Sequence, residues 1–125
     1  MALVVRAFPV LEGMEESVRD IARTMAAERQ AQAAEFFAGL GVRHESWHLQ
    51  ETPAGPWVIV VSDIDEPEER AQQYSAAREE FATWFKERTL ELTGIDPYTQ
   101  PLGPPTESIF HWTRRDSTQE KATPD

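Results

Sequence analysis

The sequence predicts an α+β domain organised around one buried strand, and three observations lead to this prediction. Residues 57–64 (WVIVVSDI) are the only unbroken run of β-branched apolar residues, which is typical of a strand buried on both faces. Segments 14–39 and 65–93 repeat apolar residues at three- and four-residue steps, which is the period of an amphipathic helix. Shorter apolar runs near both ends of the chain supply further strands.

Composition limits the number of domains and the classes of partner. At 125 residues the chain is long enough for one ordinary domain and too short for two. Its 12 Lys and Arg against 22 Asp and Glu give a net charge of −10, which opposes binding to nucleic acid or to an anionic membrane. No stretch approaches the roughly 20 apolar residues of a membrane span. A signal-peptide pattern and cysteine are also absent, so we expect a cytoplasmic protein.

The first half of the chain predicts a strand, a helix and a second strand. Residues 2–8 are apolar and β-branched, and Pro9 ends this strand. Residues 14–39 predict one amphipathic helix of about seven turns, with acidic residues at its start and a glycine at its end. Residues 42–51 alternate polar and apolar side chains, so they predict a strand that the turn at 52–56 joins to the central strand as a hairpin.

The second half predicts a helix, an irregular crossing and a last strand. The helix over 65–93 begins with an acidic turn that contains a proline, and an interruption is expected near Ser75. Residues 95–105 hold four of the nine prolines and predict a segment without regular structure. Residues 106–113 (TESIFHWT) predict the last strand.

This order of elements, βαββαβ, is that of a ferredoxin-like domain, which we expect to span residues 1–113. Two helices would cover one face of a four-stranded antiparallel sheet, with the first and third strands in the centre. Residues 114–125 are polar, lack aromatic side chains and predict a disordered tail. The other face of the sheet has no helix to cover it, so we expect a homodimer closed through that face, of the kind called a dimeric α/β barrel.

Four stretches of the sequence resemble one family. They are AFPVLEGMEESVR, RHESWHLQETPAGPWVIVVSDID, FATWFKERTLELTGID and the terminal ESIFHW. Together they resemble a bacterial family of small dimeric α/β-barrel proteins that is known only as a domain of unknown function. The resemblance covers nearly the whole chain except the tail. It implies the fold and the dimer, but no activity, cofactor or catalytic residue. Monooxygenases of antibiotic biosynthesis, haem-degrading enzymes and lactone isomerases share this fold, and their activities would carry over by fold analogy alone.

The alternation of side chains along the strands gathers the candidate site on the helix-free face. If Leu3, Val5 and Trp47 face the helices, the opposite face holds the ligand-binding candidates Arg6, His44, His48, His111 and Trp57. The side taken by Trp57 depends on the hairpin, because a five-residue loop in place of a four-residue loop exchanges the faces of the central strand.

Arg6 separates two interpretations of this face. A buried guanidinium needs an anion, which is either an internal carboxylate (Asp63, Glu45 or Glu107) or a bound anionic or aromatic ligand. In the second interpretation Arg6 is the counter-ion of the ligand and a histidine is the acid or base.

The histidines have a structural interpretation as well. His44 and His48 stand roughly 13 Å apart along one strand, and His111 falls on the opposite edge strand. A site made of the three therefore needs a second subunit, and otherwise each is a hydrogen-bonded histidine of the sheet. We expect no metal and no cofactor, because the spacings of zinc, calcium and phosphate-binding motifs are absent.

Three classes of function remain open. The first is a small-molecule-binding dimer without catalytic activity. The second is a cofactor-free monooxygenase or isomerase-like enzyme that uses Arg6 with a histidine, and the four tryptophans favour it. The third is a structural or interaction protein whose acidic helices meet a basic partner. A cavity that joins Arg6 to a histidine would favour a ligand, whereas a barrel filled by apolar side chains would argue against one.

Overall fold

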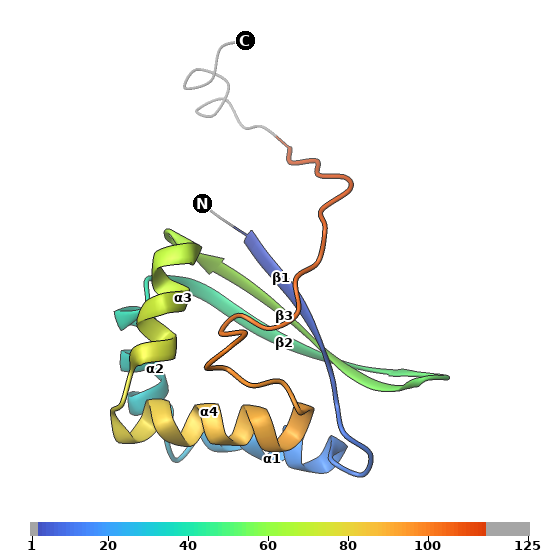
Figure 1. The fold of residues 1–125 in the computed structure, drawn as a ribbon, viewed down its shortest axis with the longest axis horizontal. Coiled ribbons are helices and arrows are strands. Elements are labelled where there is room, and N and C mark those ends of the chain that lie inside the picture. Colours follow the sequence, from blue (N-terminus) through green and yellow to red (C-terminus); the bar gives the residue numbers. More distant parts are fainter. Residues whose placement is uncertain (1–2, 115–125) are drawn as a thin grey trace.

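The computed structural model describes residues 3–114 (Figure 1). It is an α+β fold with one antiparallel sheet, as the sequence predicts. Along the chain its elements are β1 (Leu3–Pro9), α1 (Glu15–Ala26), α2 (Gln30–Gly39), β2 (Val42–Thr52), β3 (Gly55–Ile64), α3 (Pro67–Ala76) and α4 (Glu80–Thr93). Within the described residues, no helix is both long enough and apolar enough to cross a membrane.

The sheet has the strand order β1-β3-β2. β3 is central, as its apolar run predicts, with its Val60 opposite Arg6 of β1 and Trp47 of β2. The prediction that β1 is also central is wrong for the described residues, because only one bridge, between Arg6 and Pro105, forms at its outer edge. The predicted fourth strand at 106–113 is not formed, and this segment leaves the sheet after that bridge (Figure 1).

The predicted single helix at 14–39 is two helices, because its two halves pack against different cores. Val18 and Ile21 of α1 belong to the core under β3, whereas Ala33 of α2 belongs to an aromatic core with α3 and α4. The break between them places the Arg29 guanidinium over two rings of α4, 5.1 Å from the centre of Phe81 and 4.4 Å from that of Trp84. Cation–π contacts of this kind help to hold the change of direction.

The predicted interruption near Ser75 is confirmed as the junction between α3 and α4. The last backbone carbonyl groups of α3 have no amide donors from a following turn. Lys86 of α4, which is fully buried at this junction, donates hydrogen bonds to them instead. Its Nζ donates to the backbone oxygens of Tyr74 at 2.9 Å, Ser75 at 3.1 Å and Ala77 at 2.6 Å. The ring of Tyr98 lies 4.5 Å from the same ammonium group. Lys86 therefore ties the two helices together.

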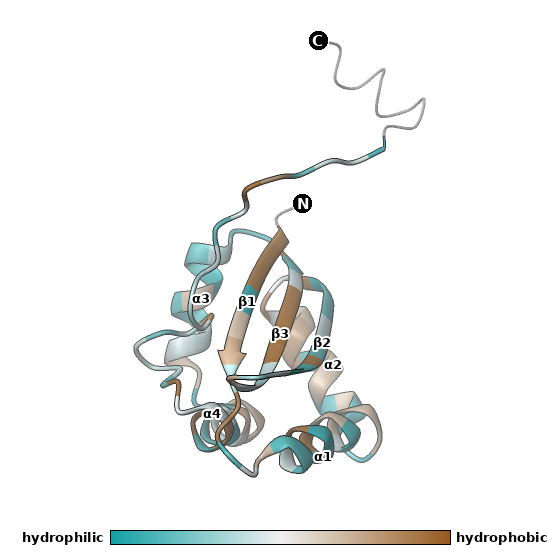
Figure 2. Ribbon diagram, turned by 90° about the vertical axis from the view of Figure 1, so that its right-hand side faces the viewer, coloured by the Kyte–Doolittle hydropathy of each residue, from teal (hydrophilic) through white to brown (hydrophobic). Residues whose placement is uncertain are grey.

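The helices cover one face of the sheet and leave the other open (Figure 2). Val58, Val60 and Ile64 of β3 point toward the helices, so the intervening residues of this strand point away, as predicted for Trp57. We call the open side the helix-free face. At its centre and along β2 it presents Val5, Ala7, Trp57, Ile59, Val61, His44, Ser46 and His48.

Candidate ligand-binding cavity

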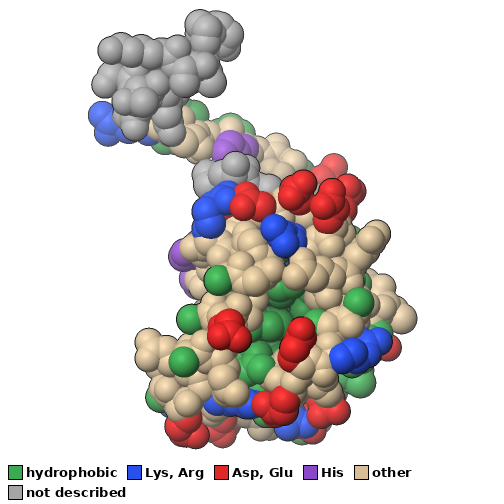
Figure 3. All heavy atoms as spheres, turned by 90° about the vertical axis from the view of Figure 1, so that its left-hand side faces the viewer, with side chains coloured by type: hydrophobic (Ala, Val, Ile, Leu, Met, Phe, Trp, Pro, Cys, Tyr) green, Lys and Arg blue, Asp and Glu red, His purple; other side chains and the backbone are tan. Residues whose placement is uncertain are grey.

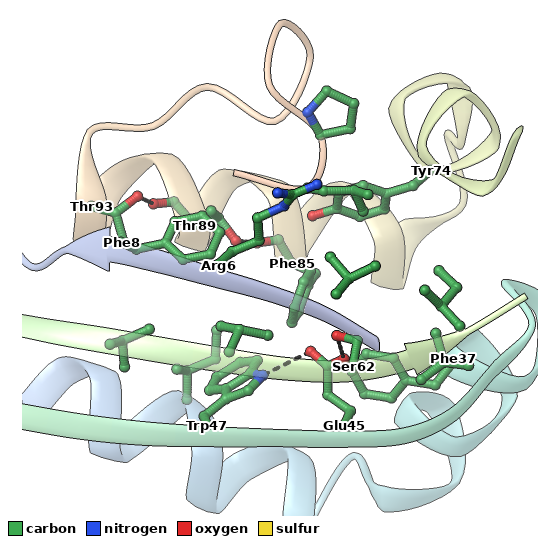
Figure 4. A pocket seen from close by; sticks show the side chains of 18 of the residues that line it. Arg6, Phe8, Phe37, Glu45, Trp47, Ser62, Tyr74, Phe85, Thr89 and Thr93 are labelled. Atoms are coloured by element: carbon green, nitrogen blue, oxygen red, sulfur yellow. Dashed lines mark hydrogen bonds between the residues drawn. The ribbon is translucent and has the colours of Figure 1, made fainter. Parts of the chain in front are cut away.

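A cavity of about 130 Å³ lies between the helix-covered face of the sheet and the helices (Figure 4). Its wall is mostly aliphatic and aromatic, with contributions from all three strands and all four helices. The lining side chains include Val4, Phe8, Ile21, Phe36, Phe37, Trp47, Val58, Val60, Tyr74, Phe85 and Leu92. A concave apolar wall with a few polar groups is the usual composition of a small-molecule site in proteins.

Arg6 faces this cavity and not the helix-free face, so the predicted orientation of β1 is wrong. Val4 and Phe8 line the cavity with it, whereas Leu3 and Val5 are exposed. Apart from Arg6, both sides of this strand are apolar, so alternation alone does not decide its orientation. Pairing with β3 decides it, and the result buries the large ring of Phe8 against the core.

The Arg6 guanidinium has no structural anion among the described residues. Its Nε is buried without a hydrogen-bond partner, and none of the ion pairs of residues 3–114 includes Arg6. Of the carboxylates expected to pair with it, Asp63 accepts a hydrogen bond from Arg43 at 2.8 Å. Glu45 is occupied by Trp47 and Ser62. A buried guanidinium nitrogen without an acceptor is costly unless another group meets it.

Glu45 is the acidic group of the cavity. Its carboxylate accepts hydrogen bonds from Ser62 Oγ at 2.6 Å and from Trp47 Nε1 at 2.8 Å. Burial raises the pKa of the Glu45 carboxyl above its ordinary value, and these two donors oppose the shift without cancelling it. The cavity therefore favours the neutral form of this acid more than water does.

Tyr74 brings a hydroxyl group to the cavity from α3, and Thr89 and Thr93 bring two from α4. Burial raises the pKa of the Tyr74 phenol far above its ordinary value, so this group stays a neutral hydrogen-bond donor. Figure 4 shows Arg6 and Tyr74 extending into the cavity, with Glu45 and Trp47 on the β2 side. One guanidinium, one weakened acid and several hydroxyls thus share an otherwise apolar space.

An outer groove reaches the same guanidinium from the surface. This groove has a volume of about 810 Å³ and lies between the start of α3 and residues 100–105. Val4, Arg6, Pro101 and Leu102 line both the groove and the cavity. Arg6 therefore stands between the outer groove and the inner cavity. On the side of the molecule where α2 and α3 lie, Figure 3 shows a hollow with apolar side chains at its floor and acidic side chains around it.

The histidines predicted to join Arg6 lie elsewhere. His44 and His48 are opposite Asp63 and Ile59, on the helix-free face, and His48 Nε2 is 3.1 Å from Ser46 Oγ. His111 lies on segment 106–113, with its Nε2 2.9 Å from Thr113 Oγ1. The site that would join Arg6 to these histidines within one chain is therefore not formed. Among residues 3–114, no group of three His, Cys, Asp or Glu side chains is placed to hold a metal ion.

Sequence reasoning missed the roles of Glu45 and Tyr74 in the cavity. A signal for Glu45 is present, since it shares strand parity with Trp47, on the side predicted to face the helices. An acid on an apolar side of a strand marks a functional or hydrogen-bonded position. Tyr74 has no such signal, because its aromatic neighbours along α3 and α4 suit a packed core equally well.

Comparisons of the chain with family models, with curated proteins and with solved structures find no match. The resemblance to the dimeric barrel family therefore stays a prediction.

Proposed function

We propose that the protein binds a small organic acid with an apolar, ring-sized body in the cavity between sheet and helices. The observation that carries this proposal is the Arg6 guanidinium, which is turned into an apolar cavity with its Nε buried and unpaired. A carboxylate satisfies a guanidinium better than a neutral acceptor does, because the hydrogen bonds are charge-assisted and geometrically matched.

The size of the cavity supports a ligand with a single ring. Its volume of about 130 Å³ is close to the ~150 Å³ of an engineered apolar cavity that admits benzene. Phe8, Phe85 and Trp47 offer aromatic contacts to such a ring. Burial raises the pKa of the Glu45 carboxyl, and this shift toward the neutral form lessens its repulsion of an anionic ligand.

The proposal includes the subunit and its location. We infer a ferredoxin-like subunit that lacks the fourth strand of that fold within residues 3–114 and works as a homodimer in the cytoplasm. The strand order β1-β3-β2 and the open sheet face support this form of the fold. The absence of cysteine supports the location.

Benzoate and benzamide provide a direct test, because they share the ring and differ in charge. We expect calorimetry to give benzoate the lower Kd by roughly tenfold or more, the difference that one charge-assisted hydrogen bond makes. Arg6→Met should remove this preference while keeping the apolar stem of the side chain. Arg19→Met is the matched control, since Arg19 pairs with Glu16 on the exposed side of α1 and should not alter binding.

Stability measurements separate a ligand-binding Arg6 from a structural one. Deleting a charge that has a buried partner costs about 3–5 kcal/mol, whereas no described carboxylate would lose a partner here. Arg6→Met should therefore melt at or near the wild-type temperature. Equal binding of the two compounds by the wild type, or a benzoate preference that survives Arg6→Met, would overturn the proposal.

An enzyme of the cofactor-free isomerase class is the second candidate function. It is favoured by one observation, that Glu45, whose pKa is raised by burial, and the neutral phenol of Tyr74 line the same cavity from opposite sides. Glu45 would move a proton to or from the bound acid, with Tyr74 as hydrogen-bond donor. Conversion of a bound acid, followed by NMR in the wild type and lost in Glu45→Gln, would distinguish this function from binding alone.

A further inference from the structure

Segment 106–113, which we call the arm, is exposed and carries three large apolar side chains. Ile109, Phe110 and Trp112 are 86%, 83% and 73% exposed, more than any other large hydrophobic residue of the described chain. Three such side chains within four positions are an apolar surface without a cover. Such a surface on one segment marks a binding element of a protein.

Within the described residues, the arm is held to its own sheet only at its start. Its first residue is held at β1, where Thr106 Oγ1 donates to the backbone oxygen of Val5 at 2.5 Å, next to the antiparallel bridge of Arg6 and Pro105. The described part of β1 starts at Leu3, so three described residues lie beyond Arg6 in the direction in which the arm runs. Antiparallel pairing with these three would use residues 106–108, so the apolar residues of the arm have no partner in the described part of β1.

The helix-free face is a second uncovered apolar surface in the same chain. Trp57, Ile59 and Val61 lie in its middle and are only half-buried, and Val5 beside them is exposed. Among the strand positions described on this face, Asp63 is the only carboxylate, and the Arg43 guanidinium that lies 2.8 Å from it also pairs with Asp65. On a chain of net charge −10 this face is therefore where two copies approach with the least repulsion.

We propose that a second copy of the chain covers the helix-free face and that the two copies exchange arms, each arm crossing onto the partner's helix-free face. The inference rests on the homodimer of the proposed function, but not on its ligand. In a two-fold symmetric dimer each chain supplies one arm and one helix-free face. The arm of each copy then covers the helix-free face of the other, so neither surface stays exposed. An arm that inserts elsewhere on its own chain would leave the face open.

The apolar area available fits a stable interface. Phe110 and Trp112 each bring an aromatic surface of about 150–250 Å², so two exchanged arms bury on the order of 600–1,000 Å² of side chain. A stable interface buries about 1,200–2,000 Å² in total. The two sheet faces supply the remainder through their half-buried tryptophans and β-branched residues.

Light scattering of the full chain tests the dimer. The wild type should have twice the chain mass of 14.2 kDa, and Phe110→Ser with Trp112→Ser should raise the dimer dissociation constant at least tenfold. Ile59→Glu should do the same by placing a charge in the interface. Leu90→Ser is the matched control, because Leu90 is an exposed leucine of α4 and its replacement should leave the mass unchanged.

Cross-linking tests the exchange of arms itself. Because the chain has no native cysteine, only the introduced thiols react. Thr113→Cys and Ser46→Cys chains, mixed and treated with a short bismaleimide, should give a covalent pair. Thr113→Cys mixed with Glu87→Cys, which places the thiol on an exposed position of α4, should not. A wild type of single-chain mass would overturn both dimer and exchange, whereas a dimer without the specific cross-link would overturn the exchange alone. Benzoate binding is measured separately, so failure of either result leaves the ligand proposal to its own test.

Discussion

Replacement of Lys86 by methionine should destabilise the fold more than any single change at the surface. The substitution keeps the apolar stem and removes the ammonium that three backbone oxygens share. Because Lys86 is 0% exposed, water does not replace the lost donor without opening the junction of α3 and α4. The end of α3 then keeps carbonyl groups without partners.

The size of the effect follows from the opposing contributions at this site. Hydrogen bonds from a charged donor contribute about 1.5–3 kcal/mol each, and burial of the ammonium costs several kcal/mol in return. With three acceptors on one donor, we expect a net loss of about 2–4 kcal/mol in the free energy of unfolding. For a domain of this size that is a fall in Tm on the order of 10 °C.

Urea unfolding followed by circular dichroism measures this loss. Arg19→Met is the control, because it removes a cation from an exposed ion pair on α1, where the side chains of Arg19 and Glu16 are 49% and 66% exposed. That change should cost less than about 1 kcal/mol. Equal stability of Lys86→Met and the wild type would refute the reasoning, since it would mean that burial of the ammonium costs as much as its three hydrogen bonds return.

Two further predictions concern the walls of the cavity. Glu45 has a raised pKa in the folded state, so its contribution to stability is complete below its unfolded pKa of about 4.5 and declines as the pH rises through the folded value. Glu45→Gln should therefore gain stability relative to the wild type as the pH rises, and a difference independent of pH in urea titrations would contradict this. Gly103→Ala should cost about 2–4 kcal/mol, because Gly103 has a φ of +86° and an added Cβ would collide with the Phe8 ring. Gly39→Ala, where the added Cβ meets nothing, should cost nothing, and equal losses at both glycines would count against the packing described for residue 103.

The sequence by itself determines the hairpin and its central strand. Residues 42–51 alternate in polarity and 57–64 are continuously apolar, and both patterns are local properties with a period of two residues. The pairing of Thr52 with Gly55 closes the hairpin through two residues and leaves Trp57 on the helix-free face, as predicted. The coarse α+β class and the interruption of the second helix are predictable for the same reason, since they depend on neighbouring residues.

Only the tertiary structure decides the contents of the cavity. β1 is apolar on both sides, so its alternation fits two orientations, and pairing of Arg6 with Val60 selects the one that turns the guanidinium toward Glu45 and Tyr74. The division of the first helix has the same origin, because its halves serve two cores that the chain assembles from distant segments. A local pattern predicts which residues are buried. Contacts between segments far apart in sequence determine which of these residues line the same cavity.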